Sequence, residues 1–372
     1  MSRPDAGPVV SPPASSGYGL VVDLPGKWML AGEYSALTPR GLALAAAVRP
    51  GFRLELRPAT GAAFRLDGAS FSSLPPGPAG ASPVDFMEQA WLEAAAWKQS
   101  HPPSPGTSLA EPTSGHRLSS SPHTDGFEAV FSRLPATGPR PGSSAALVVG
   151  MIAALDRWWG LGLSVEQQIA LARRAHSQVQ GGGSGYDVST VALGGIVLSR
   201  ATGGPKAQSR PALQGLFLVC ARATAKVPTT RHIEAFRSAL SRTDFRRALT
   251  RHVRASNSLV RLLWEWPASP PHRLAWMVEA CERTLTDLSA TGRLRIFTPE
   301  IRAMQAVARR QGIPARISGG GGGDAVVAFA PGPHQAQRLS DAFAASGWPA
   351  SVLDPDSPCG GPETLLVSKP AS

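Results

Sequence analysis

Hydrophobic positions recur along the chain at two spacings, and each spacing predicts a different kind of element. Apolar residues three or four positions apart, separated by polar ones, predict helices over residues 85–99, 143–159 and 164–180. Two serines open the second helix, and Ser164 with Gln167 forms a capping-box pattern at the start of the third. In the first helix we expect four side chains to face the core: Phe86, Trp91, Ala94 and Trp97.

Strands are predicted where apolar residues alternate with polar ones or form short runs bounded by turn residues. These segments are residues 20–23, 52–57, 194–198, 315–317 and 325–329. Two more helices follow from their end signals: residues 298–312, opened by Thr-Pro and closed by Gly, and residues 334–346. Helices and strands therefore interleave without an internal repeat, which predicts the α+β class.

The length of 372 residues exceeds that of one average domain and favours two. We expect an N-terminal domain over residues 19–200 and a C-terminal domain over residues 201–372, because the sequence near residue 200 is linker-like. Residues 1–18 are rich in Pro, Ser and Gly and predict a disordered tail. The similar composition of residues 101–125 predicts a flexible insertion.

Composition narrows the class of protein. Hydrophobic residues make up 42% of the chain, enough for a sizeable core. The longest clean apolar run, residues 42–48, falls far short of the ~20 residues of a membrane-spanning helix, so we expect no membrane association. The N-terminal region lacks the apolar stretch of a secretory signal. Three widely spaced cysteines form no metal-type pair, and we expect a reducing, cytoplasmic location.

The formal net charge of +11 raises the question of a nucleic-acid partner. Only five of the 37 basic residues are lysine, and no basic stripe is interleaved with aromatic residues. We therefore expect no nucleic-acid partner, while a small polyanionic substrate would suit the same charge. The sequence predicts no particular oligomeric state.

Two segments rich in small residues are candidates for phosphate chemistry. In LPGKWMLAGEY, residues 24–34, Lys27 follows a glycine turn and can neutralise a phosphate, although a solvated surface lysine has the same pattern. In PGSSAA, residues 141–146, a helix begins whose N–H groups and dipole favour an anion. A serine hydroxyl there can add a ligand to Mg²⁺, and a simple helix cap is the alternative.

Two more glycine-rich segments complete the set. SGGGGGD, residues 318–324, lies between two predicted strands and favours close backbone approach to an anion, a flexible hairpin being the alternative. GGGSGYD, residues 181–187, ends in Asp187, which can accept a hydroxyl proton, orient a lysine, or form an Asx turn. Neither a Walker A motif nor a Rossmann glycine motif is present.

Taken in order, these segments resemble the GHMP kinase superfamily. PGKWMLAGEYSAL resembles its first motif, PGSSAALVVG its serine-rich nucleotide motif, and SGGGGGDAVVAF its third, glycine-rich motif. Within the superfamily, AHSQVQGGGSGYDV, residues 175–188, and the aspartate after Gly323 most resemble the phosphomevalonate kinases. The resemblance implies a two-domain α+β GHMP-kinase-like fold with the active site in the cleft between the domains.

The resemblance also implies an activity, a cofactor and roles for individual residues. It implies ATP-dependent phosphorylation of (R)-5-phosphomevalonate to 5-diphosphomevalonate, in the mevalonate pathway of isoprenoid biosynthesis, with ATP and Mg²⁺. Asp187 matches the catalytic aspartate, Lys27 the lysine near the transferring phosphoryl group, and Ser144 the Mg²⁺ ligand. Positioning and charge neutralisation would supply most of the rate, since phosphoryl transfer needs little covalent work from the protein.

Further binding residues follow from the same matches. Those implied for ATP are Arg140, Gly142, Ser143, Ser144 and Ala145. Those implied for the substrate and its phosphates are Lys27, Glu33, Tyr34, Ser184, Gly185, Ser318, Gly319, Gly320, Gly321, Gly322 and Gly323. The chain departs from the family pattern at Arg140-Pro141, where Gly-Leu is usual, and at His176, where mevalonate kinases carry a glutamate ligand of Mg²⁺.

Other activities on the same fold stay open at this point. The resemblance also allows a mevalonate kinase, a diphosphomevalonate decarboxylase, or a catalytically silent relative that binds nucleotide. The segment around His176 and the residue Asp324 favour the phosphomevalonate reaction. The presence of both Lys27 and Asp187 argues against the silent relative, which needs neither.

Overall fold

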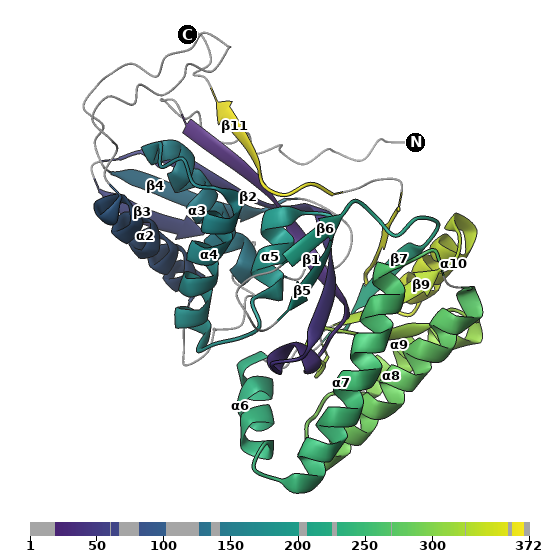
Figure 1. Cartoon of the computed structure of the whole chain (residues 1–372). Helices are drawn as coiled ribbons and strands as arrows, with labels where there is room; N and C mark the ends of the chain where they lie inside the picture. The colour runs from purple at the N-terminus through teal and green to yellow at the C-terminus, as the bar shows by residue number, and fades with distance from the viewer. Residues whose placement is uncertain are drawn as a thin grey trace, which may run out of the picture.

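The computed structural model describes ten stretches of the chain (Figure 1): residues 19–59, 61–66, 82–101, 126–134, 142–200, 207–224, 229–268, 270–323, 325–355 and 359–367. The predicted tail at 1–18 and nearly all of the predicted insertion at 101–125 lie outside them, as do Arg140, Pro141 and Asp324.

A seven-stranded sheet forms the first half of the molecule. Its main path runs in the order β11, β1, β2, β4, β3, while β5 pairs with β2 and β6 pairs with β5. Its pairs are antiparallel except for the parallel pair β3 and β4. The bounds are β1 Gly19–Ala31, β2 Leu42–Pro58, β3 Ala62–Leu66, β4 Phe127–Arg133, β5 Ile196–Arg200, β6 Ala207–Arg210 and β11 Glu363–Val367.

Three helices pack on this sheet, α2 Pro83–Ser100, α3 Ser143–Trp159 and α5 Tyr186–Leu193, and a fourth, α4 Val165–Gln180, packs on these helices. Helix α3 is apolar almost all round and lies at the centre of the core, between the sheet and the other helices. Figure 1 shows α2, α3 and α4 together beside the strands. Because α3 is buried, its N-terminus is held rigidly against β1.

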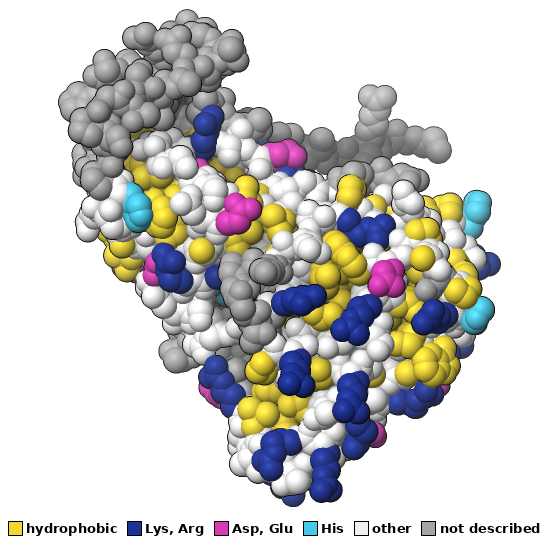
Figure 2. Space-filling view, viewed as in Figure 1, with side chains coloured by type: hydrophobic (Ala, Val, Ile, Leu, Met, Phe, Trp, Pro, Cys, Tyr) yellow, Lys and Arg dark blue, Asp and Glu magenta, His cyan; other side chains and the backbone are white. Residues whose placement is uncertain are grey.

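The second half has a four-stranded sheet in the order β10, β7, β9, β8. Its strands are β7 Phe217–Arg222, β8 Ala315–Ser318, β9 Ala325–Ala330 and β10 Ala350–Leu353. Its helices are α6 Thr229–Ala239, α7 Thr243–Trp264, α8 Pro271–Gly292, α9 Pro299–Arg310 and α10 Pro333–Ala345. Figure 2 shows basic side chains gathered over the lower part of one face. Helix α7 carries the exposed arginines Arg246, Arg247, Arg251, Arg254 and Arg261.

The two halves share a core around the lower ends of β1 and β2. Trp28 and Leu44 from these strands pack in one buried cluster with Leu259 and Leu263 of α7 and Val327 of β9. The two long strands therefore connect the halves without a break (Figure 1). Within the described residues, every helix is too short or too polar to cross a membrane.

The structure confirms the elements predicted from hydrophobic spacing, with changed bounds. Helices predicted at 85–99, 143–159 and 164–180 are α2, α3 and α4, and Ser164 forms the predicted capping box with Gln167. The predicted strand 52–57 is only the end of β2, which begins at Leu42. Helices α5 to α8 and strands β3, β4, β6, β7, β10 and β11 were not among the predicted elements.

Candidate active site

Lys27 is presented by an irregularity in strand β1. The pairing of β1 with β2 shifts register between Leu24 and Gly26, and this bulge accommodates Pro25, which has no N–H to donate. The Lys27 side chain is buried. Its Nζ donates a hydrogen bond of 2.6 Å to the Tyr186 hydroxyl and lies 4.8 Å from the centre of that ring. The ammonium group is therefore held in one place.

The N-terminus of α3 packs directly against Lys27. Gly142 caps the helix at φ 109°, and a Cβ there would lie 2.9 Å from the Lys27 Cγ, so only glycine fits. The first helical hydrogen bond runs from the Ala146 N–H to the Gly142 carbonyl. The N–H groups of residues 143–145 precede it and point out of the helix end, a geometry suited to an anion, beside a lysine. The side chain of Ala145 faces the core.

Asp187 lies in the first turn of α5, two residues after the Gly185 cap. Its Oδ1 accepts a hydrogen bond of 2.9 Å from the Val188 N–H. Burial opposes ionisation of this carboxyl, but His176, the Lys27 ammonium and the backbone bond outweigh it and hold the pKa of Asp187 below its ordinary value. Asp187 is therefore a stable carboxylate at neutral pH and a weak proton acceptor.

His176 on α4 connects the serine motif to Asp187. Its Nε2 lies 3.1 Å from the Ser144 Oγ and 3.8 Å from the Asp187 Oδ2. The ring is 3% exposed and packs 5.4 Å from the ring of Phe86. Burial lowers the pKa of His176 in spite of the opposing Asp187 charge, so the imidazole is neutral at pH 7. A neutral ring can orient the Ser144 hydroxyl by a hydrogen bond.

The third glycine-rich motif binds to the same strand that carries Lys27. Ser318 Oγ accepts a hydrogen bond of 3.0 Å from the Met29 N–H, two residues beyond the lysine. The Tyr34 hydroxyl donates one of 2.6 Å to the Gly320 carbonyl. Tyr34 has a φ of 58°, a left-handed conformation that a tyrosine rarely adopts. The first and third motifs are thus tied together at two points.

Within this loop, Gly321 has the clearest need for glycine. Its φ is 79°, and a Cβ there would lie 2.6 Å from the Ile296 carbonyl oxygen. That carbonyl accepts a hydrogen bond of 2.8 Å from the Gly322 N–H. Any side chain at Gly321 would therefore displace the loop from the segment that supports it.

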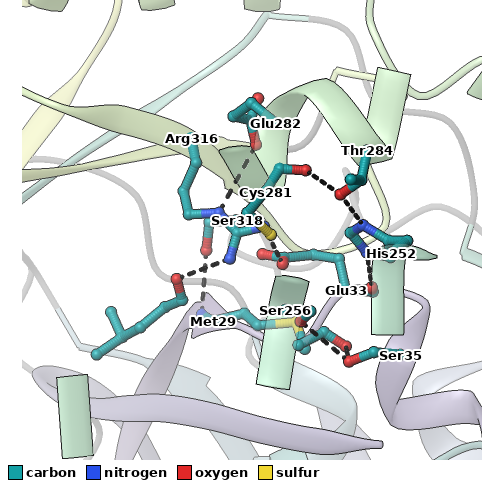
Figure 3. Close-up of polar contacts among 12 residues, drawn as sticks. Met29, Glu33, Ser35, His252, Ser256, Cys281, Glu282, Thr284, Arg316 and Ser318 are labelled. Atoms are coloured by element: carbon teal, nitrogen blue, oxygen red, sulfur yellow. Dashed lines mark hydrogen bonds and ion pairs between the residues drawn. The ribbon is translucent and has the colours of Figure 1, made fainter. Parts of the chain in front are cut away.

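Glu33, expected among the substrate-binding residues, lies in a buried polar cluster (Figure 3). Its Oε2 is 2.6 Å from the Arg316 Nη2, and both side chains are fully buried. Arg316 also donates to the Leu30 carbonyl at 3.1 Å, and its Nε lies 3.6 Å from a carboxylate oxygen of Glu282. The Glu33 carbonyl is 2.9 Å from the His252 Nε2. The structure therefore assigns the Glu33 carboxyl to the junction of β1, α7, α8 and β8.

Two carboxyls in this cluster share one guanidinium. Burial, only partly offset by Arg316, raises the pKa of Glu33 to about 7. Burial likewise lowers the pKa of His252 to about 4, so its ring is neutral. Arg316 stays charged, because Glu33, Cys281 and Glu282 surround it. The junction is a buried polar network whose protonation changes near neutral pH.

The remaining predicted residues fall into three groups. Ser143 and Ser144 are half-buried at the start of α3, and Gly319 to Gly323 form the loop between β8 and β9. The Ser184 carbonyl accepts a hydrogen bond from Arg173, and Gly185 begins α5 at φ 64°. Arg140 lies outside the described residues. The structure brings together Lys27, Ser144 and Asp187, which the sequence separates widely.

Three residues of the site were not predicted: Tyr186, Arg173 and Arg316. Tyr186 is one of only three tyrosines and stands next to Asp187, a signal that could have drawn attention to it. The arginines carry no such signal, because this chain has too many arginines for any one to stand out. Arg316 would be expected at the surface, since charged residues are seldom buried without partners.

Comparison with known proteins identifies the family. A family model described as "GHMP kinases N terminal domain" matches residues 141–195, the stretch that contains Ser144, His176 and Asp187. A second model, "GHMP kinases C terminal", matches residues 275–349, which contain the glycine loop. The chain carries the N-terminal and the C-terminal domain of the GHMP kinases. The two matches occur in the order that this GHMP kinase fold requires, and they confirm the resemblance seen in its motifs.

A curated relative of this GHMP kinase is "Phosphomevalonate kinase" of Streptomyces sp. (strain CL190). It is 27% identical over 230 residues, which cover 54% of this chain and 60% of the relative. The chain thus matches less than two thirds of that relative's length.

Solved structures share the fold over nearly the whole chain. A Lin0012 protein from Listeria innocua has a TM-score of 0.72 at 19% identity, covering 93% of this chain and 99% of that one. Streptococcus pneumoniae phosphomevalonate kinase in complex with phosphomevalonate and AMPPNP has a TM-score of 0.67 at 18% identity, covering 90% of this chain and 99% of that one. L. major mevalonate kinase in complex with R-mevalonate has a TM-score of 0.63 at 19% identity, covering 93% of this chain and 99% of that one. At these identities the likeness shows the two-domain fold alone.

Proposed function

We propose that this GHMP kinase transfers the γ-phosphoryl group of ATP to the phosphate group of (R)-5-phosphomevalonate, giving 5-diphosphomevalonate and ADP. An acceptor phosphate oxygen forms the new P–O bond, and the bond from the γ-phosphorus to the bridging oxygen of ADP breaks. The relative from Streptomyces supports this choice of acceptor. We propose a cytoplasmic location, to which three free, buried cysteines are suited.

The observation that carries the proposal is the likeness to the Streptomyces phosphomevalonate kinase, and the low pKa of Asp187 agrees with it. A base that removes a hydroxyl proton works best with a pKa near the working pH, whereas the pKa of Asp187 is held low. A phosphate monoester has a second pKa of about 6 and is already anionic at neutral pH. Such an acceptor needs no base. It needs neutralisation and orientation, which a fixed ammonium group beside a carboxylate supplies.

Each residue of the site then has a definite task. The N–H groups of residues 143–145 would hold phosphate oxygens of the nucleotide at the α3 terminus. Lys27, fixed by Tyr186, would neutralise charge between donor and acceptor. Asp187 would orient Lys27 and keep it charged. The glycine loop at 319–323 would close over the phosphates, since it lacks side chains that could obstruct them.

The residues present fit a Mg²⁺ ion. The Ser144 hydroxyl and the Asp187 carboxylate are hard oxygen donors that both lie against His176. No group of three or more His, Cys, Asp and Glu side chains converges in the described residues, and Mg²⁺ needs none, because it retains waters and shares phosphate oxygens. When bound, the ion would neutralise phosphate charge. His176 would orient Ser144 and is not needed as a ligand.

The test is ADP release with Mg·ATP and one acceptor at a time: mevalonate, phosphomevalonate or diphosphomevalonate. We expect turnover with phosphomevalonate only. Turnover with mevalonate alone would assign the protein to the mevalonate kinases. Phosphate and CO₂ release from diphosphomevalonate would assign it to the decarboxylases, and no turnover by folded, ATP-binding protein would indicate a silent relative.

A further inference from the structure

A hollow beside Asp187 is lined by basic side chains that the proposed mechanism does not use. It has a volume of about 240 Å³ and is bordered by α4 and the glycine-rich loop that follows it. Its lining residues are Arg173, Arg174, His176, Ser177, Gly182, Gly183 and Gly185. No residue of α3, where the nucleotide motif lies, borders it. The hollow is therefore bordered by α4 and the loop alone, and Gly185 in its lining lies two residues before Asp187.

Two guanidinium groups reach the loop from different elements. Arg173 on α4 donates a hydrogen bond to the Ser184 carbonyl. Arg237 on α6, from the other half of the molecule, donates one of 3.0 Å to the Gly181 carbonyl. The hollow thus lies where the two halves face each other, which is where a GHMP kinase is expected to bind its substrate.

The glycines of the loop are what allow this approach. A Cβ at Gly182 would lie 2.8 Å from the Arg237 Nη2, and a Cβ at Gly185 would lie 2.3 Å from the Arg173 Nε. Both glycines also have positive φ, 111° and 64°. The loop is built so that two guanidinium groups lie against its backbone: Arg173 lines the hollow, and Arg237 reaches Gly182, which also lines it.

The charge of these arginines is not balanced by carboxylates. Arg174, their neighbour, donates to the Glu93 carboxylate at 2.8 Å. Arg173 and Arg237 donate only to backbone carbonyls within the described residues. The Asp187 charge favours the charged form of Arg173, although the two side chains do not form an ion pair. Two positive groups with spare N–H donors, next to the reacting centre, are suited to an anion with several oxygens.

From this geometry we infer that Arg173 and Arg237 form the subsite for the phosphate group of the acceptor substrate and make the protein specific for a phosphorylated acceptor. The inference rests on the proposed function and names the residues that carry its specificity. An acceptor phosphate brought to the phosphates of the nucleotide meets strong repulsion, which Lys27 alone does not balance. The two arginines supply the missing positive charge on the acceptor side.

The test is calorimetric binding to the full-length protein saturated with Mg·AMPPNP, with phosphomevalonate and mevalonate titrated separately. We expect Arg173→Gln and Arg237→Gln each to weaken phosphomevalonate binding roughly ten- to a hundred-fold, and mevalonate binding by less than about three-fold. Arg173→Lys should restore part of the loss. The control is Arg246→Gln, because Arg246 also donates to loop carbonyls, those of Leu240 and Ser241, but none of its hydrogen-bond partners belongs to the loop that borders the hollow.

Three results would overturn the inference: unchanged phosphomevalonate affinity in both variants, an equal loss of affinity for mevalonate, or a loss of affinity for Mg·AMPPNP alone. The last would assign the arginines to the nucleotide. If wild type neither binds nor converts phosphomevalonate, the proposed function fails, and titration with inorganic phosphate then decides the subsite separately. Phosphate binding by wild type that both variants lose would retain the subsite, and equal binding by all three would remove it.

Discussion

At the scale of single residues, the proposed mechanism depends on one carboxylate held ionised. We expect Asp187→Asn to lower kcat roughly a hundred-fold or more while leaving ATP affinity within about three-fold, because Asp187 acts on the reacting groups more than on bound nucleotide. Asp244→Asn is the matched control: Asp244 also accepts from the next N–H, that of Phe245, at 2.8 Å in the first turn of a helix, but is exposed. Equal turnover of both variants in a steady-state assay would remove Asp187 from the site.

Lys27 is the second residue on which the proposed chemistry depends. We expect Lys27→Ala to lower kcat by at least about a hundred-fold with a smaller change in ATP affinity, since it removes the buried charge that stabilises the transferring group. Lys98→Ala is the control, because Lys98 lies over an aromatic ring at a similar distance, 4.9 Å from the centre of Trp159. The comparison is steady-state kinetics with ATP varied, and a loss confined to KM for ATP would contradict the proposed role.

At the scale of elements, the third motif needs glycine for geometric reasons. We expect Gly321→Ala to abolish most activity, because its Cβ would collide with the Ile296 carbonyl and displace the loop. Gly347 has a similar φ, 83°, but open space around it. Gly347→Ala should therefore cost only about 1 kcal/mol of stability and leave kcat unchanged. Thermal unfolding and kcat for the two variants make the comparison, and equal activities would contradict the need for close approach.

The elements also show what could be predicted from the sequence. The helices with clear caps and the glycine motifs were predicted because these signals are local, as at Ser164 and Gly312. The length of β2 was not, because the pairing of Leu42–Ala46 with β5 depends on residues about 150 positions away. Nor could the sequence show that Arg316 is buried between two carboxyls, since that environment is assembled from β1, α8 and β8.

At the scale of the whole molecule, the halves meet at the Glu33–Arg316 cluster. We propose that no single boundary near residue 200 separates the two domains. Strands β6 and β11 come after that residue in the sequence but belong to the first sheet. The cluster ties the strand that carries Lys27 to the strand that leads into the glycine loop. Its protonation should therefore be measurable as a change in global stability.

The pKa of Glu33 is raised from 4.5 to about 7, so the folded state holds a proton that the unfolded state releases. Its stabilising contribution is complete below pH 4.5 and is lost as the pH rises through 7, by at most about 3 kcal/mol. Glu33→Gln removes this dependence. We therefore expect wild type to lose stability relative to Glu33→Gln between pH 5 and pH 8 in urea unfolding. The other ionisable groups of the cluster are present in both proteins, so the difference isolates Glu33; these groups are Arg316, Glu282, Cys281 and His252. A constant difference across that range would contradict the raised pKa.

The central claim is that the protein joins two phosphates. The measurement that tests it most directly is the ³¹P NMR spectrum of a reaction containing the protein, Mg·ATP and phosphomevalonate. We expect the monoester signal to be replaced by the coupled pair of doublets of a diphosphate monoester as ADP accumulates in equal amount. Release of ADP with inorganic phosphate and an unchanged monoester signal, or conversion of mevalonate but not phosphomevalonate, would contradict the claim.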